Sequence, residues 1–281
     1  MNKLTQYQFA YFAAIVDGEG YIGKKYGEIL INTTNRELAL FLRRKIGGNL
    51  HRRKGVKKEG GGRYKDYYSW GIYKRELLKK EIIKNIFSYL IVKKERICQN
   101  YSPNDCATHL SKSVDTLWGN TEPSPLKDSY LAGIVDGEGC IHIRTLRNKE
   151  GRKLQFLPNI NIGNTDIDLI EWIKSNYGGR IDFKKGTDKW KDRYYWNSNA
   201  RPVKELCSKI YHYMIVKKPH IKQLNKFYKL PRTNTQTRWH EAIVSPNGKY
   251  LTTEGWERAH KIVRTISILN NKQSLLIKGK V

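Results

Sequence analysis

Acidic side chains are scarce in this sequence. Its 281 residues include 53 Lys and Arg but only 26 Asp and Glu, which gives a formal net charge of +27 at pH 7. An excess of this size attracts polyanions, so nucleic acid is the first class of partner to consider. The hydrophobic fraction of 39%, with 11% aromatic residues, is nevertheless sufficient for a hydrophobic core. General disorder is therefore not expected.

Long apolar runs and clustered cysteines are missing as well. No stretch approaches the ~18–20 apolar residues that a membrane span needs, and the opening Met-Asn-Lys-Leu-Thr-Gln begins no secretory signal. The absence of C-x-x-C spacing argues against a disulfide framework and against a zinc site. The four cysteines are Cys98, Cys106, Cys140 and Cys207. We therefore expect a reducing intracellular compartment, which is cytoplasm or nucleoid, or a mitochondrion or chloroplast, and no membrane partner.

An internal repeat organises the chain. Residues 11–20 read Tyr-Phe-Ala-Ala-Ile-Val-Asp-Gly-Glu-Gly, and residues 130–139 read Tyr-Leu-Ala-Gly-Ile-Val-Asp-Gly-Glu-Gly. Further matches follow in the same order, among them two Gly-Gly pairs and two copies of Ile-Val-Lys-Lys. Two copies are too few for a solenoid and predict a pseudo-symmetric pair of domains. The expected division is a first repeat at 1–101, a linker at 102–123, a second repeat at 124–228 and a C-terminal extension at 229–281.

Local patterns predict that each repeat is an α+β unit of order αββαββα. A capping box at Thr5–Gln8 begins a helix that Gly18 and Gly20 are expected to end. A second capping box, Thr34-x-x-Glu37, predicts a helix to residue 46. Apolar and polar residues alternate at 141–144 and 159–162, which indicates half-buried strands. The C-terminal extension is expected to hold a short strand and a helix that has one apolar stripe.

The predicted sheets carry polar and basic residues on the face that no helix covers. Arg and Lys suit guanine edges and phosphates, Asn suits adenine edges, and paired strands fit the major groove of DNA. A solvated sheet face would have a similar composition, so the charge of the whole chain decides in favour of nucleic acid. The candidate DNA contacts are Lys25, Asn32, His51, Arg53, Arg63, Ser69, His142, Arg144, Asn161, Lys184, Tyr195 and Asn197.

The repeated Asp-Gly-Glu-Gly brings acids together. The helices that precede it carry small residues, Ala13-Ala14 and Ala132-Gly133, which permit close helix–helix packing. Side-by-side packing would bring the two copies of the motif near each other, and close carboxylates repel unless a proton or cation lies between them. Oxygen ligands suit Mg²⁺, and such a centre on a basic surface is typical of a phosphodiesterase. The alternative is that the glycines end the helix and the acids only cap neighbouring groups.

The two motifs, with their αββαββα context, resemble the signature of the LAGLIDADG homing endonucleases. The resemblance covers roughly residues 5–228 and is to the single-chain form with two repeats, so it implies a monomer. It also implies that the motif helices meet at the repeat interface and that the antiparallel sheets bind DNA.

The resemblance implies residue roles as well. Glu19 and Glu138 would be catalytic acids and metal ligands, and the carbonyls of Gly18 and Gly137 further metal ligands. Asp17 and Asp136 would be mainly structural. Lys93 and Lys217 would be the central lysines, with Lys94 and Lys218 as competing candidates. Asn32 would be the polar helper of the first half-site, whereas the matching position of the second is Gly163, with Asn161 or Asn164 nearby.

The activity implied is Mg²⁺-dependent hydrolysis of both strands of a long asymmetric DNA target. Mn²⁺ is expected to substitute, and Ca²⁺ to bind without supporting efficient cleavage. Two alternatives stay open: a maturase that binds its own intron RNA, and a DNA-binding regulator that does not cleave. The C-terminal extension would either contact DNA or pack on the second repeat.

Overall fold

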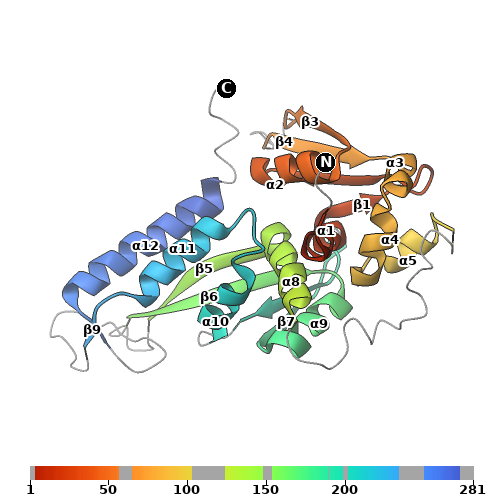
Figure 1. Ribbon diagram of the computed structural model, residues 1–281. Coiled ribbons are helices and arrows are strands. Elements are labelled where there is room, and N and C mark those ends of the chain that lie inside the picture. The colour runs from red at the N-terminus through yellow and green to blue at the C-terminus, as the bar shows by residue number, and fades with distance from the viewer. Residues whose placement is uncertain are drawn as a thin grey trace.

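The computed structural model describes residues 4–56, 65–102, 124–147, 154–188, 190–198, 202–233 and 250–272. Two four-stranded antiparallel sheets dominate it, and helices pack on one face of each (Figure 1). The strand orders are β1-β2-β4-β3 and β5-β6-β8-β7, so the second sheet repeats the topology of the first. This arrangement confirms the predicted α+β fold with two repeats.

The first repeat begins with a long helix and ends in short ones. Its elements are α1 (Gln6–Glu19), β1 (Gly20–Ile22), β2 (Ile29–Thr33), α2 (Arg36–Phe41), the π-helical η1 (Leu42–Ile46), β3 (Asn49–Arg53), β4 (Tyr67–Ile72), α3 (Lys74–Lys79), α4 (Ile82–Ile86), the 3₁₀ turn η2 (Phe87–Tyr89) and α5 (Lys94–Cys98).

The second repeat follows the same order with longer first strands. Its elements are α8 (Pro125–Gly137), β5 (Gly139–Arg147), β6 (Leu154–Asn164), α9 (Ile167–Tyr177), β7 (Arg180–Lys184), β8 (Arg193–Asn197), α10 (Pro202–Ile210) and α11 (Lys218–Tyr228). The predicted linker lies outside the described residues except for Ser102.

Two buried tryptophans fix the correspondence between the repeats. Trp70 and Trp196 are fully buried and donate from Nε1 to the carbonyls of Gly47 and Gly178, each at 2.7 Å. The matched hydrogen bonds put β4 and β8 in the same register. Tyr68 therefore corresponds to Tyr194, and Ser69 to Tyr195.

Helix boundaries follow the local signals in two cases and differ in two others. The capping box of Thr5 and Gln8 is present, and Ser124 with Pro125 begins α8 as predicted. The N-cap of α2 is Asn35, whose side chain accepts from Leu38 N, so the prediction that placed this cap at Thr34 is wrong. Gly18 also does not end α1, which continues to Glu19.

The helices α1 and α8 pack side by side between the two sheets (Figure 1). Gly133 permits the close approach, because a Cβ there would lie 2.6 Å from the carbonyl oxygen of Tyr11 and 2.7 Å from Cβ of Ala14. Both motif helices are buried along most of their length. The prediction that small residues bring these helices together is confirmed.

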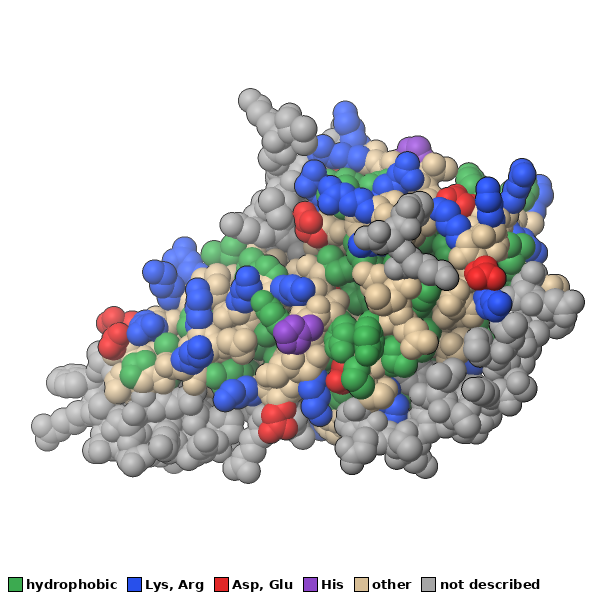
Figure 2. All heavy atoms as spheres, in the orientation of Figure 1, with side chains coloured by type: hydrophobic (Ala, Val, Ile, Leu, Met, Phe, Trp, Pro, Cys, Tyr) green, Lys and Arg blue, Asp and Glu red, His purple; other side chains and the backbone are tan. Residues whose placement is uncertain are grey.

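The C-terminal part adds β9 (Arg232–Thr233), β10 (Tyr250–Leu251) and α12 (Thr253–Lys272). The helix α12 packs on α11 and β5, with Ala259, Ile262 and Ile266 buried. Its opposite side exposes Arg258, Lys261 and Arg264 together with Glu254 and Glu257. Lys and Arg side chains lie over both repeats and this helix on the face drawn in Figure 2. None of the described helices is long and apolar enough to cross a membrane.

Candidate active site

The strand register shows which side chains share the uncovered face of the first sheet. Ile31, Trp70 and Leu50 lie opposite one another on the face that packs against helices. Their chain neighbours alternate to the other face, where the predicted contacts on these strands are Asn32, His51, Arg53 and Ser69.

The second sheet has the same alternation. Ile162, Trp196 and Ile181 lie opposite one another on the helix-covered face. The predicted contacts on the uncovered face are His142, Arg144, Asn161, Lys184, Tyr195 and Asn197.

Lys25 is not on a strand, so its predicted placement on a sheet face is wrong. The strand β1 has only three residues, and the chain turns after it, with Gly23 N donating to Glu28 O at 2.9 Å and Gly27 at φ +58°. Lys25 is exposed in this turn. Arg63 lies outside the described residues.

Hydrogen bonds already join part of the uncovered face of the second sheet. Asn161 Nδ2 donates to Asn197 Oδ1 at 2.9 Å, and Asn197 Nδ2 donates to Asp182 Oδ2 at 2.8 Å. Arg180 pairs with Asp182 at 2.9 Å. These bonds align the amides before any ligand binds.

The aspartate of each motif anchors the segment that directly precedes the last helix of its repeat, α5 or α11. Asp136 accepts from the backbone N–H groups of Ile215, Val216 and Lys217 at 2.6–2.9 Å. Asp17 accepts from the N–H groups of Ile91 and Lys93 at 2.7 and 2.8 Å. Both carboxylates are buried. This geometry assigns them a structural role.

Tyrosines tie each aspartate to the other repeat. Tyr11 donates to Asp136 at 2.9 Å, and Tyr130 donates to Asp17 at 2.7 Å. Both hydroxyls are buried beside a carboxylate, which raises the tyrosine pKa well above its ordinary value. Sequence reasoning missed these bonds, although Tyr11 and Tyr130 match each other in the repeat.

The first lysine of each Lys-Lys pair faces the motif helices. Lys93 Nζ donates to the carbonyls of Val16 and Asp17 at 2.7 and 2.5 Å. Lys217 Nζ makes the equivalent bonds to Val135 and Asp136 at 2.9 and 2.6 Å. Burial lowers the pKa of both lysines, and nearby carboxylates oppose that shift.

The second lysine of each pair lies elsewhere. Lys94 Nζ lies 5.1 Å from the ring centroid of Phe87, and Lys218 Nζ lies 5.7 Å from that of Tyr211. The geometry therefore favours Lys93 and Lys217 as the lysines nearest the acids.

The two glutamates meet at the ends of α1 and α8. A Cβ on Gly18 would lie 3.2 Å from Cγ of Glu138, and a Cβ on Gly137 would lie 3.3 Å from Cγ of Glu19. Because each glycine has no side chain, the glutamate of the other repeat can pack closely against it. Burial and then the charge of Glu138 raise the pKa of Glu19 to about 7, although Lys217 and Lys93 act against the shift.

The donor set suits a divalent cation. Glu19 and Glu138 supply carboxylate oxygens, and the carbonyls of Gly18 and Gly137 lie in the last helical turns, where carbonyls lack intrahelical donors. Burial raises the pKa of both glutamates, and the charge of Glu138 raises that of Glu19 further, so a cation at this site would favour the charged carboxylates. Within the described ranges, no group of three or more His, Cys, Asp and Glu could hold a metal.

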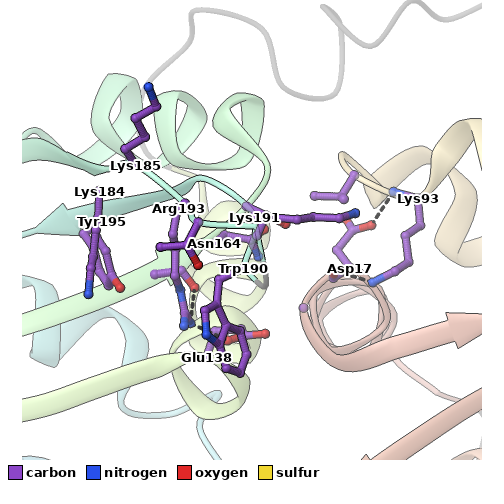
Figure 3. A pocket seen from close by; sticks show the side chains of 16 residues that line it. Asp17, Lys93, Glu138, Asn164, Lys184, Lys185, Trp190, Lys191, Arg193 and Tyr195 are labelled. Carbon is purple, nitrogen blue, oxygen red and sulfur yellow. Dashed lines mark hydrogen bonds and ion pairs between the residues drawn. The ribbon is translucent and has the colours of Figure 1, made fainter.

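Beside Glu138 a cleft of about 720 Å³ opens between the repeats (Figure 3). Lys93 lines it from the first repeat, and Lys184, Lys191 and Arg193 line it from the second. Arg193 Nη2 lies 3.8 Å from Glu138 Oε2. Sequence reasoning missed Arg193, because only the register of β6 and β8 puts it beside Gly163.

Known proteins share this architecture. The family model described as LAGLIDADG endonuclease matches residues 131–230. A Schizosaccharomyces pombe protein, the uncharacterized cox1 intron-2 37.2 kDa protein, is 23% identical over 253 residues, which are 89% of this chain and 70% of that protein.

Solved structures agree with this match. The I-LtrWI LAGLIDADG homing endonuclease bound to target DNA has a TM-score of 0.57 at 15% identity, covering 92% of this chain and 97% of that one. The LAGLIDADG meganuclease I-AabMI bound to uncleaved DNA has a TM-score of 0.56 at 17% identity, covering 93% and 98%. I-SmaMI, bound to uncleaved DNA with calcium, has a TM-score of 0.52 at 15% identity, covering 94% and 99%. Residues 131–230 thus match the LAGLIDADG endonuclease model, and the whole chain has the fold of these solved endonucleases.

Proposed function

We propose that this protein is a site-specific endonuclease that cuts both strands of double-stranded DNA with Mg²⁺ and acts as a monomer. The observation that supports the proposal most is the meeting of Glu19 and Glu138 between two sheets with basic, uncovered faces. The DNA-bound structures of I-LtrWI and I-AabMI have the same fold and support DNA as the substrate.

Each glutamate serves one strand in this proposal. Glu19 and Glu138, with the carbonyls of Gly18 and Gly137, would hold divalent metal, which supplies Lewis-acid activation of water and neutralises developing charge. Lys93 and Lys217 hold positive charge at the ends of α1 and α8 and would stabilise the charge that forms on the phosphate.

The sheets position the duplex. The uncovered residues of β3, β4, β7 and β8 would contact base edges and phosphates on either side of the acids. Asn161 and Asn197, already aligned with Asp182, would read bases in the second half-site. Lys184 would contact a phosphate near the cleft.

The test is cleavage selection from a randomised duplex library, run in parallel with Mg²⁺, Mn²⁺, Ca²⁺ and EDTA. The proposal predicts one long asymmetric target that is cut in Mg²⁺ and Mn²⁺, and bound without efficient cutting in Ca²⁺. Cleavage that is equally efficient in EDTA, or the absence of any selected target, would contradict it.

A second function is supported by one observation. The Schizosaccharomyces pombe relative is named for a cox1 intron, and a basic protein of this kind could bind the RNA of its own intron. Splicing of that intron in vitro, with and without the protein, tests this role. A Glu19→Gln, Glu138→Gln double variant would retain splicing assistance while losing DNA cleavage.

A further inference from the structure

The two half-sites differ at one pair of matched strand positions. On β2, Asn32 lies opposite Ser69, whereas on β6 the corresponding Gly163 lies opposite Tyr195. Two residues before Ser69 on β4 is Tyr67, and two residues before Tyr195 on β8 is Arg193. The first repeat thus has an Asn and a Tyr where the second has a Gly and an Arg.

Arg193 uses the space that Gly163 leaves. Its Nη2 donates to the Gly163 carbonyl at 3.2 Å and lies 3.8 Å from Glu138 Oε2 (Figure 3). The guanidinium carbon also lies 5.5 Å from the ring centroid of Tyr195. Two contacts, with the Gly163 carbonyl and the Tyr195 ring, therefore hold the guanidinium beside the acid.

The glycine is required for this arrangement. A Cβ on Gly163 would lie 3.0 Å from Nε of Arg193 and 2.9 Å from Cε1 of Tyr195. Any side chain at this position would displace the guanidinium or the ring. The glycine on β6 and the arginine on β8 therefore depend on each other, because the arginine side chain fits only where position 163 has no side chain.

The other acid lacks such a partner. Glu138 forms an ion pair with Arg193, whereas Glu19 forms none among the residues that the structure describes. The positive charges that lower the pKa of Glu19 are those of Lys217 and Lys93, and both also act on Glu138.

We propose that Arg193 is a positioning residue for the second half-site only and orients the Glu138 carboxylate, whereas the first half-site has no arginine at the matched position. This inference rests on the proposed nuclease function and deepens it. The Gly163 carbonyl and the Tyr195 ring hold the planar guanidinium so that its charge lies beside Glu138, and a lysine ammonium cannot reproduce this arrangement. The two DNA strands are consequently cut by half-sites that have different side chains beside the glutamate.

The experiment measures the cleavage of each DNA strand separately. A duplex that carries the selected target, labelled differently on each strand, is cut in Mg²⁺ by the wild-type chain, Arg193→Ala, Arg193→Lys and the control Arg180→Ala. The control removes an arginine from the same sheet face, one that pairs with Asp182 rather than with an acid of the site. Glu138→Gln identifies the strand that depends on Glu138.

Arg193→Ala should slow cutting of the Glu138 strand by about tenfold or more, because misplacing a reacting group carries a cost of this order. Cutting of the other strand should change by less than about threefold, so nicked DNA accumulates. Arg193→Lys should recover only part of the rate, and Arg180→Ala should leave the ratio of the strands unchanged.

A rescue tests the equivalence with the first repeat. The triple variant Gly163→Asn, Arg193→Tyr and Tyr195→Ser imports the first repeat's residues without the clash at Tyr195, and it should cut the Glu138 strand faster than the double variant Arg193→Tyr with Tyr195→Ser. Thermal unfolding of each variant confirms that it folds. DNA affinity in EDTA, measured by fluorescence anisotropy, should remain within about threefold of wild type for Arg193→Ala.

The outcomes separate the two proposals. Equal slowing of both strands, or a loss of affinity in EDTA that accounts for the slower cutting, overturns the positioning role and makes Arg193 a phosphate contact. That result leaves the nuclease function standing. A wild-type chain that cuts neither strand overturns both.

Discussion

Asp136 shows why the acid two residues before Glu138 has a different role. One oxygen accepts from the N–H groups of Ile215 and Val216 and from the Tyr11 hydroxyl, and the other accepts from the N–H of Lys217. A carboxylate so enclosed by donors has little capacity left for a metal. The same aspartate holds Lys217 where its ammonium group can face the site.

Asp136→Asn should destabilise the fold. The amide would direct an N–H₂ group at donors, leaving buried N–H groups without an acceptor, at a cost of about 2–3 kcal/mol in the free energy of unfolding. Urea denaturation measures it, with the exposed Asp168→Asn as the matched control. A loss equal to that of the control would refute the anchoring role.

Glu19 makes stability depend on pH in the opposite sense to an ordinary ion-paired acid. Its pKa rises from 4.5 to about 7 on folding, so the folded state holds the proton more tightly than the unfolded state. Stability is therefore lost as the pH rises from about 4.5 to about 7, and the full cost applies above that range.

Glu19→Gln should consequently stabilise the metal-free protein at pH 8, by up to about 3 kcal/mol, and have little effect at pH 4.5. Mg²⁺ should raise the melting temperature of the wild-type protein at pH 8 and that of the variant much less. Thermal unfolding in EDTA and in Mg²⁺ measures both effects. The same change in stability at the two pH values would contradict this account.

At the scale of elements, the contact between α1 and α8 depends on two glycines with different neighbours. A Cβ on Gly133 meets backbone of α1, which cannot move without separating the helices. A Cβ on Gly137 meets only side chains, Cγ of Glu19 at 3.3 Å and Cδ1 of Ile15 at 3.8 Å.

The two Gly→Ala variants should therefore differ in their effects on stability and on cleavage. Gly133→Ala should lower the free energy of unfolding by about 1–3 kcal/mol through overpacking. Gly137→Ala should leave stability nearly unchanged, because alanine also favours the helix, yet slow cutting of the Glu19 strand. Chemical denaturation and strand-resolved cleavage measure these effects. Equal destabilisation by both variants would show that the contact does not discriminate between the two positions.

The sequence predicts elements well where the signal is local. Thr5 with Gln8, and Ser124 with Pro125, begin their helices as expected, because an N-cap depends on residues within one turn. Asn35 replaces Thr34 as a cap because both are capping residues and the strand end decides between them. Lys25 falls in a turn because β1 stops after three residues.

Contacts between elements were harder to predict. Small residues predicted the packing of α1 on α8, since they directly set how close two helices can approach. The pairing of Arg193 with Glu138 depends instead on the register of β8 against β6, which no local pattern contains. Tyr11 and Tyr130 were visible as matched residues, but their partners lie in the opposite repeat.

At the scale of the whole molecule, the chain carries a net charge of +27, and exposed basic side chains lie on both sheets and on α12. The helix α12 exposes Arg258, Lys261 and Arg264 while its apolar side is buried on the second repeat. Packing and DNA contact are therefore compatible roles for this part of the chain.

DNA binding should weaken steeply as salt rises. If about six or more phosphates are contacted, affinity for the target should fall by about 10³-fold or more between 50 and 200 mM salt. Fluorescence anisotropy in Ca²⁺ across this range measures the slope, and Arg258→Ala with Lys261→Ala should reduce it if α12 contacts the backbone. A flat response would remove charge as the basis of binding.

The assignment of one acid to each strand is tested most directly by strand-resolved cleavage with Glu19→Gln and Glu138→Gln on the same duplex. Each variant should lose double-strand cleavage, and the two should fail on opposite strands while keeping near wild-type affinity. Full double-strand cleavage by either single variant, or loss of the same strand in both, would contradict the account.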